Sequence, residues 1–179
     1  MKRLIATIIF CTALSGCGSD PAATLPAATS TGATPATAVP AAESPEGTWM
    51  TQPFGHDAIA GTLDAAGLGE HTEQFFTIDE TPDDLVIKLR LEAGAWTAYR
   101  SAGTDSTVSL HDRGTYATEG DTLLYRPFSG GLNTYRWSVA GDQLSLTFVS
   151  TTEPSYAGLP NEVFQRAFYT TVPFGWTPR

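Results

Sequence analysis

Cysteine is nearly absent from this chain. The sequence has two cysteines, Cys11 and Cys17, and both lie close to the N-terminus. A domain built from the later residues therefore contains no disulfide, and its hydrophobic core must hold it together. Residues 46–179 are enough for one such core but leave no room for a second domain.

Recognisable catalytic motifs are also missing. The sequence contains no G-x-S-x-G, H-E-x-x-H, C-x-x-C, P-loop or G-x-G-x-x-G pattern. The histidines, His56, His71 and His111, are too scattered in sequence to indicate a metal site. We therefore expect a protein that is not an enzyme, with no catalytic residue, no metal and no cofactor.

Positive charge is scarce, with 10 Lys and Arg against 19 Asp and Glu. Two of the ten, Lys2 and Arg3, lie in a segment that we interpret as removed, which leaves 8 against 19 and a net charge near −11. So acidic a chain is unsuited to nucleic acid or anionic lipid surfaces. We expect no nucleic-acid partner, and we expect a monomer.

No long apolar run marks a transmembrane helix, which takes about 20 residues. The run Leu4–Ala13 follows a basic start and is typical of an export signal. It leads into Leu14-Ser15-Gly16-Cys17, which resembles the lipobox of bacterial lipoproteins. The resemblance implies that residues 1–16 are removed and that Cys17 carries acyl chains such as palmitate. The chain would then be lipid-anchored at the extracytoplasmic face of a cell membrane. The alternative is an ordinary secretory signal with a chance cysteine.

Residues 17–45 are rich in Ala, Thr, Pro, Ser and Gly and have almost no large apolar side chains. Such a segment cannot bury enough surface to fold. We interpret it as a disordered linker between the lipid anchor and a folded domain at residues 46–179.

The helical pattern is confined to one stretch near the start of the folded domain. A helix over 57–66, capped by Asp57, places Ile59 and Leu63 on one face. A second short helix fits residues 70–76. Helices this short need packing against another element to be stable.

From Asp84 the apolar period changes to two. In 85–92, apolar residues alternate with charged ones such as Lys88 and Arg90. Further strands are predicted at 47–49, 95–102, 107–111, 115–118, 122–126, 134–139, 143–150 and 162–172. Short strands joined by tight turns form a meander that removes its edges by closing. We predict a mainly β fold: a single up-and-down antiparallel β-barrel of about 8–10 strands, with a short helix-turn-helix after the first strand.

This order of elements resembles a known family. Gly47-Thr48-Trp49, then helices around Leu63-x-x-x-Gly67-Leu68-Gly69, then a meander opening at Asp84-Leu85-Val86-Ile87 are similar to the intracellular fatty-acid-binding proteins. The similarity extends more loosely to lipocalin-like (calycin) barrels. It implies a cavity for a hydrophobic ligand under a helical lid. The chain also resembles a group of actinobacterial exported proteins in its Gly-Thr-Trp start, its Trp137-Ser138-Val139 hairpin and an ending like Tyr169–Phe174.

The family resemblance implies a ligand site near the end of the chain. Fatty-acid-binding proteins hold the ligand carboxylate with an Arg-x-Tyr; the match here is Arg166-Ala167-Phe168, with the tyrosine displaced to Tyr169. The candidate ligand-binding residues are therefore Arg166, Phe164, Phe168 and Tyr169, and the candidate lid residues are Ile59, Leu63, Leu68 and Phe75. The alternative is an Arg166 that packs outward or pairs with an acid such as Glu162.

Two further sequence patterns could indicate a functional site, but each has a simpler structural interpretation. His111-Asp112 is a conceivable acid/base pair, but neighbours on a strand point to opposite faces. The acidic run Asp79–Asp84 offers oxygens to calcium, but proline and unpaired acids suit an exposed turn better.

These observations favour a membrane-tethered binding module for a small hydrophobic or amphipathic ligand such as a fatty acid. One alternative is a non-enzymatic structural or protein-interaction module of the cell envelope whose barrel is filled by its own side chains, and a third possibility is an enzyme inhibitor that acts through a surface loop. A large apolar cavity would favour the first, and a packed interior the second.

Overall fold

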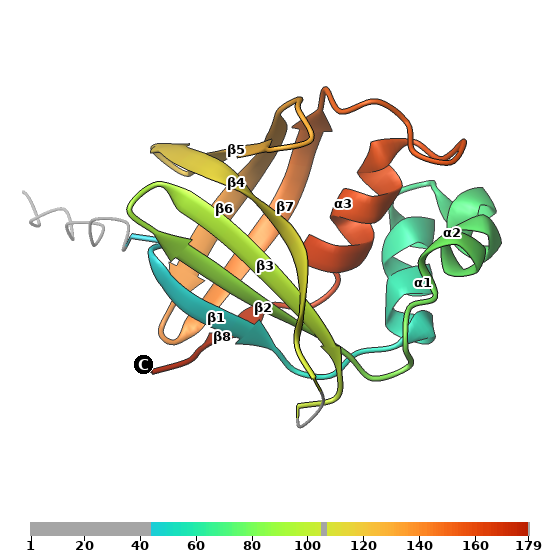
Figure 1. Cartoon of the computed structure of the whole chain (residues 1–179), viewed down its shortest axis with the longest axis horizontal. Coiled ribbons are helices and arrows are strands. Elements are labelled where there is room, and N and C mark those ends of the chain that lie inside the picture. The colour runs from blue at the N-terminus through green and yellow to red at the C-terminus, as the bar shows by residue number, and fades with distance from the viewer. Residues whose placement is uncertain (1–43, 105–106, 179) are drawn as a thin grey trace, which may run out of the picture. The chain divides into compact units, whose positions relative to one another are not determined.

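Eight antiparallel strands close into an up-and-down barrel in the computed structural model, which describes residues 44–104 and 107–178 (Figure 1). The strands are β1 (Gly47–Thr51), β2 (Leu85–Glu92), β3 (Ala95–Ala102), β4 (Ser109–Glu119), β5 (Thr122–Pro127), β6 (Asn133–Ala140), β7 (Gln143–Thr151) and β8 (Phe174–Trp176). Each pairs with its neighbour along the chain, and β8 pairs with β1 to close the barrel. The predicted fold class is confirmed. The predicted signal (1–16), Cys17 and the linker up to residue 43 lie outside the described residues.

Strand β2 shows why the sequence forms a barrel wall. Its apolar residues Leu85, Ile87, Leu89 and Leu91 are completely buried, whereas Arg90 is exposed. Because successive side chains of a strand point to opposite faces, the alternation places one face in the core. The prediction from the period of two is confirmed here.

Aromatic rings occupy the centre of the barrel. Trp96 on β3 stacks on Tyr125 of β5 with ring centroids 4.3 Å apart. Its ring lies 6.2 Å from Tyr135 of β6 and 5.2 Å from Tyr169. All four residues are fully buried. Side chains therefore fill the interior that the family resemblance assigns to a ligand.

The helical insertion follows β1 as predicted, in the form of α1 (His56–Ala65), the 3₁₀ helix η1 (Gly69–His71) and α2 (Thr72–Asp79). Gly55 occupies the N-cap of α1 and no side chain caps it. The predicted capping role of Asp57 is therefore wrong. Asp57 instead lies in the first turn, where a carboxylate interacts favourably with the helix dipole.

The predicted last strand at 162–172 is wrong, because α3 (Asn161–Tyr169) occupies this segment. Figure 1 shows α3 at one end of the barrel, between the strands and α1. Its residues Val163, Ala167 and Phe168 are buried in the core. Strand β4 also runs without a break where two short strands were predicted. Within residues 44–104 and 107–178, none of the helices has the length and apolar character needed to cross a membrane.

Candidate functional site

A pocket of about 350 Å³ opens at the end of the barrel where α3 lies. Side chains from β4, from the segments after β5 and β7, from α3 and from the end of α2 surround it. We call it the mouth pocket and define it by its lining residues: Asp79, His111, Asp112, Ser129, Glu153, Tyr156, Asn161, Phe164, Gln165, Phe168 and Tyr169. Three carboxylates and four Phe and Tyr rings line it, so it suits a ligand with a polar and an apolar part.

A β-bulge in β4 turns His111 and Asp112 toward the same pocket. Ala98 of β3 pairs with Asp112, and the next residue, Tyr99, pairs with Leu110, so His111 is an extra residue in the ladder. Both His111 and Asp112 line the mouth pocket. The prediction that they point to opposite faces is therefore wrong, because strict alternation holds only in a regular strand.

Asp112 is a half-buried carboxyl group with few partners. Its Oδ1 accepts a hydrogen bond of 2.7 Å from the backbone N–H of Arg113, and its Oδ2 accepts a long one of 3.5 Å from the Tyr169 hydroxyl. Burial raises the pKa of Asp112, and the hydroxyl of Tyr125, the Arg113 N–H and the Tyr169 hydroxyl partly offset this effect. The pKa values of Tyr169 and Tyr135 are also raised, mainly by burial and next by the charge of Asp112.

His111 is the second titratable group of the pocket. Its ring packs edge-on against Phe168 at a centroid distance of 4.3 Å and lies 6.3 Å from Tyr169. Burial, followed by the charge of Arg100, lowers the pKa of His111 to about 4, although Asp79 acts in the opposite direction. The imidazole is therefore neutral at pH 7 and offers one donor and one acceptor.

Glu153 organises the opposite side of the pocket. Its Oε1 accepts a hydrogen bond of 3.1 Å from Ser129, and its Oε2 accepts bonds of 3.0 Å from Asn133 and 3.1 Å from Gln165. The amide of Gln165 also donates to Asn161 at 2.8 Å, and its oxygen accepts from the Tyr135 hydroxyl. This network fixes the first turns of α3 to the ends of β6 and β7.

Three polar atoms on residues that adjoin the pocket lining have no hydrogen-bond partner among the described residues: Trp96 Nε1 beside Tyr169, the Tyr125 hydroxyl beside Asp112, and Asn133 Oδ1 beside Glu153. All three residues are completely buried. The Tyr125 hydroxyl is near enough to Asp112 to influence its pKa, yet its geometry forms no hydrogen bond. A buried group without a partner costs about 1 to 3 kcal/mol. A ligand or an ordered water would supply the missing partners, so these atoms favour this end of the barrel as the candidate site.

The predicted ligand-binding residues separate into two groups. Phe164, Phe168 and Tyr169 line the mouth pocket, but they do so from a helix. Arg166 is not among the lining residues. Its guanidinium pairs with Glu162 at 2.7 Å and lies over the Phe148 ring at 4.8 Å. The structure therefore shows the alternative arrangement, in which Arg166 is tied to Glu162.

The predicted lid residues lie in the helical insertion. Ile59, Leu63 and Phe75 are completely buried and Leu68 is half-buried. The Phe75 ring contacts Phe164 and Phe168 of α3 at centroid distances of 5.5 and 5.6 Å. The insertion thus packs on α3, and α3 contributes five of the eleven residues that line the mouth pocket.

Sequence reasoning missed most of the polar residues of this site. Tyr125, Asn133, Glu153 and Gln165 come from β5, β6, the segment after β7 and α3. No short motif links them. The local signals were the His111-Asp112 pair and Asp79 at the start of the acidic run.

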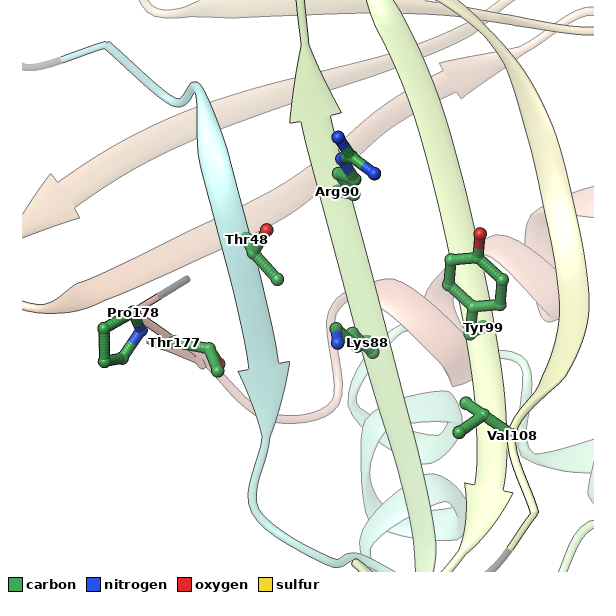
Figure 2. A pocket seen from close by; sticks show the side chains of 7 residues that line it. All are labelled: Thr48, Lys88, Arg90, Tyr99, Val108, Thr177 and Pro178. Carbon is green, nitrogen blue, oxygen red and sulfur yellow. The ribbon is translucent and has the colours of Figure 1, made fainter.

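A larger depression of about 520 Å³ lies on the outer wall of β1, β2 and β3, with Thr177 and Pro178 at its edge (Figure 2). Thr48, Lys88, Arg90, Tyr99 and Val108 form the rest of its lining, and no lining residue is fully buried. The guanidinium of Arg90 is paired with Glu92. Because this outer groove has no unsatisfied buried group, we consider the smaller mouth pocket the better candidate.

Comparison of the chain with protein-family models, curated proteins and solved structures finds no match. In the part of the chain that the structure describes, no three His, Cys, Asp or Glu side chains are grouped so as to hold a metal ion.

Proposed function

We propose that this protein is a membrane-tethered extracytoplasmic lipoprotein whose barrel binds a small amphipathic ligand in the mouth pocket. The lipobox-like residues 14–17 support the tether. The observation that carries the binding role is the mouth pocket, together with the unpartnered Tyr125 hydroxyl and Asn133 Oδ1 on residues that adjoin its lining carboxylates Asp112 and Glu153. The role is binding, and we assign no catalytic step.

The ligand class differs from the fatty acid that the family resemblance implies. A fatty-acid carboxylate needs a positive partner, and Arg166 is engaged by Glu162. The mouth pocket instead presents the carboxylates of Asp112 and Glu153. Because like charges repel, these two groups disfavour an anionic head. A fatty acid is therefore not the ligand that we propose.

A second candidate is a non-enzymatic structural or protein-interaction module of the envelope. The observation that favours it is the packed interior, where Trp96, Tyr125, Tyr135 and Tyr169 occupy the barrel centre. In this case the mouth pocket would hold water alone.

The binding role is tested on protein purified from the envelope of its own host. Native mass spectrometry should detect a bound small molecule on the wild type. A Ser129→Trp variant should lose it, because Ser129 lines the pocket and a large ring there fills the opening. Ser138→Trp is the matched control, since Ser138 is an exposed residue of β6 outside the pocket. Absence of any bound species from wild type and control would leave the interaction module as the function.

The tether is tested separately. Cells that express the full chain are labelled with an alkyne fatty acid. The wild type should be labelled, and a Cys17→Ala variant should not. Equal labelling of both would overturn the lipoprotein assignment without affecting the mouth pocket.

A further inference from the structure

We propose that the mouth pocket selects a small aromatic or alkyl ammonium ion, with the ammonium group at Asp112 and the apolar body against the rings of α3. This inference rests on the proposed ligand-binding function and specifies the class of ligand.

The charge of the lining is the first support. Among the described residues, the mouth pocket is lined by three carboxylates and by no Lys or Arg. Asp79 is neutralised by Arg100, with Nη1 and Oδ1 2.6 Å apart. Asp112 and Glu153 form no ion pair with any described residue, and Glu153 is held by neutral donors. A partly buried carboxyl group without a cationic partner is costly, so a positive ligand stabilises this arrangement.

The unpartnered buried atoms are an independent support. The oxygens of Tyr125 and Asn133 have no hydrogen-bond partner among the described residues, and both residues are completely buried. Tyr125 is next to Asp112, and the Asn133 amide donates to Glu153. Both free oxygens can accept hydrogen bonds, and each lies beside a carboxylate. An ammonium group carries three N–H donors and no acceptor, which matches these two oxygens but not the third unpartnered atom, Trp96 Nε1, which is itself a donor.

The aromatic rings fit the rest of such a ligand. Phe164, Phe168 and Tyr169 line the pocket, and Tyr156 packs edge-on against Phe164 at 5.7 Å. Ring faces attract cations and also cover apolar groups. His111 is neutral at pH 7 and therefore adds no positive charge that would repel the ligand.

The volume limits the size of the ligand. About 350 Å³ is at the lower end of the range of small-molecule sites, so a single ring with a short amine chain is suitable. An inorganic cation is a poorer fit, because no three His, Cys, Asp or Glu side chains of the described residues, including those of this lining, are grouped so as to hold a metal ion.

Three probes of similar shape and different charge test the proposal: 2-phenylethylammonium, 2-phenylethanol and 3-phenylpropanoate. Isothermal titration calorimetry on the purified protein should give an affinity for the ammonium ion about ten- to a hundredfold higher than for the alcohol, as expected for a charge-assisted hydrogen bond. The propanoate should bind more weakly than the alcohol.

Variants locate the effect. Asp112→Asn should remove the preference for the ammonium ion over the alcohol. Asp121→Asn removes an exposed carboxylate that pairs with Arg136 on the outer wall, and it should keep the preference. Tyr125→Phe removes the free hydroxyl but leaves the ring, and it should weaken ammonium binding severalfold. It serves as a second test if Asp112→Asn does not fold.

The outcomes separate the two proposals. Equal affinity for ammonium ion and alcohol, preference for the propanoate, or a preference that survives in Asp112→Asn would overturn the cation inference. The binding role would still stand if Ser129→Trp displaced a ligand of another class. Failure of all three probes overturns the cation inference, and an additional lack of any bound species in native mass spectrometry would overturn the binding role too.

Discussion

Acid should destabilise the fold through His111. Its imidazole packs against Phe168 and lies near Tyr169 of α3, and the charged groups that shift its pKa are Arg100 of β3 and Asp79 of α2. Burial of the ring lowers the pKa of His111 from 6.5 to about 4. The unfolded chain therefore binds a proton between these two values, while the folded chain does not.

The sign and size follow from proton linkage. Stability rises with pH wherever the unfolded state binds more protons, so this contribution is complete above pH 6.5 and is lost as the pH falls toward 4. Each pKa unit corresponds to about 1.4 kcal/mol, and the interval from 6.5 to about 4 gives a loss of about 3 kcal/mol. Asp112 acts in the opposite sense: its pKa is raised, so its contribution is present below the ordinary value of 3.8 and is lost as the pH rises through the folded value.

Urea unfolding at a series of pH values between 7 and 4 measures the effect. Because Asp112 is present in every variant, the difference between wild type and His111→Gln isolates the histidine. The decrease in the free energy of unfolding from pH 7 to 4 should be about 3 kcal/mol smaller in His111→Gln than in the wild type. His111→Asn should behave in the same way, since it also lacks an imidazole. Parallel pH curves for the wild type and both variants would refute the burial argument.

Three other substitutions follow from the packing. Trp49→Ala should lower the free energy of unfolding by about 3 to 5 kcal/mol, because Trp49 is 2% exposed and contacts Trp176; an unchanged urea midpoint would contradict this. Gly114→Ala should lower the free energy of unfolding by about 1 to 3 kcal/mol, because the new Cβ would lie 2.0 Å from the backbone oxygen of Arg126 on β5. An unchanged free energy of unfolding would mean that β4 can move at this position. Arg166→Gln should cost less than about 1 kcal/mol in urea unfolding, since its ion pair with Glu162 is partly exposed. The same variant should leave fatty-acid uptake unchanged, and weaker uptake would restore the carboxylate role of Arg166.

The barrel was predictable because its signal is local. In β2 every second residue from Leu85 to Leu91 is apolar and faces the core, and the residues between them face the opposite side of the sheet. A tight turn joins this strand to β3. Pairing between neighbours in sequence then follows with little choice of topology. The helical insertion was predictable for the same reason, because Ile59 and Leu63 are one helical turn apart and both are buried.

The segment of α3 was misassigned because its sequence fits both periods. Phe164, Arg166 and Phe168 alternate as in a strand, and aromatic residues favour strands. The same segment has Val163 and Ala167 four residues apart, and these share the buried face of a helix. Short apolar runs cannot be assigned by period alone. Position relative to the barrel decides, because α3 covers the open end beside β7 (Figure 1).

The bulge in β4 was not predictable, and it shows what the site requires. Gly114 and Asp112 face inward, so regular alternation would also turn Leu110 inward and His111 outward. The extra residue reverses this order: Leu110 is 51% exposed, and His111 lines the mouth pocket beside Asp112. The bulge therefore exposes the Leu110 side chain to solvent and places both titratable groups, His111 and Asp112, in one pocket. Because exposing a leucine forgoes about 1.5 to 3 kcal/mol of burial, stability alone does not explain this arrangement. Irregularities such as this bulge are expected at functional sites, where some stability is lost in order to position the side chains of the pocket.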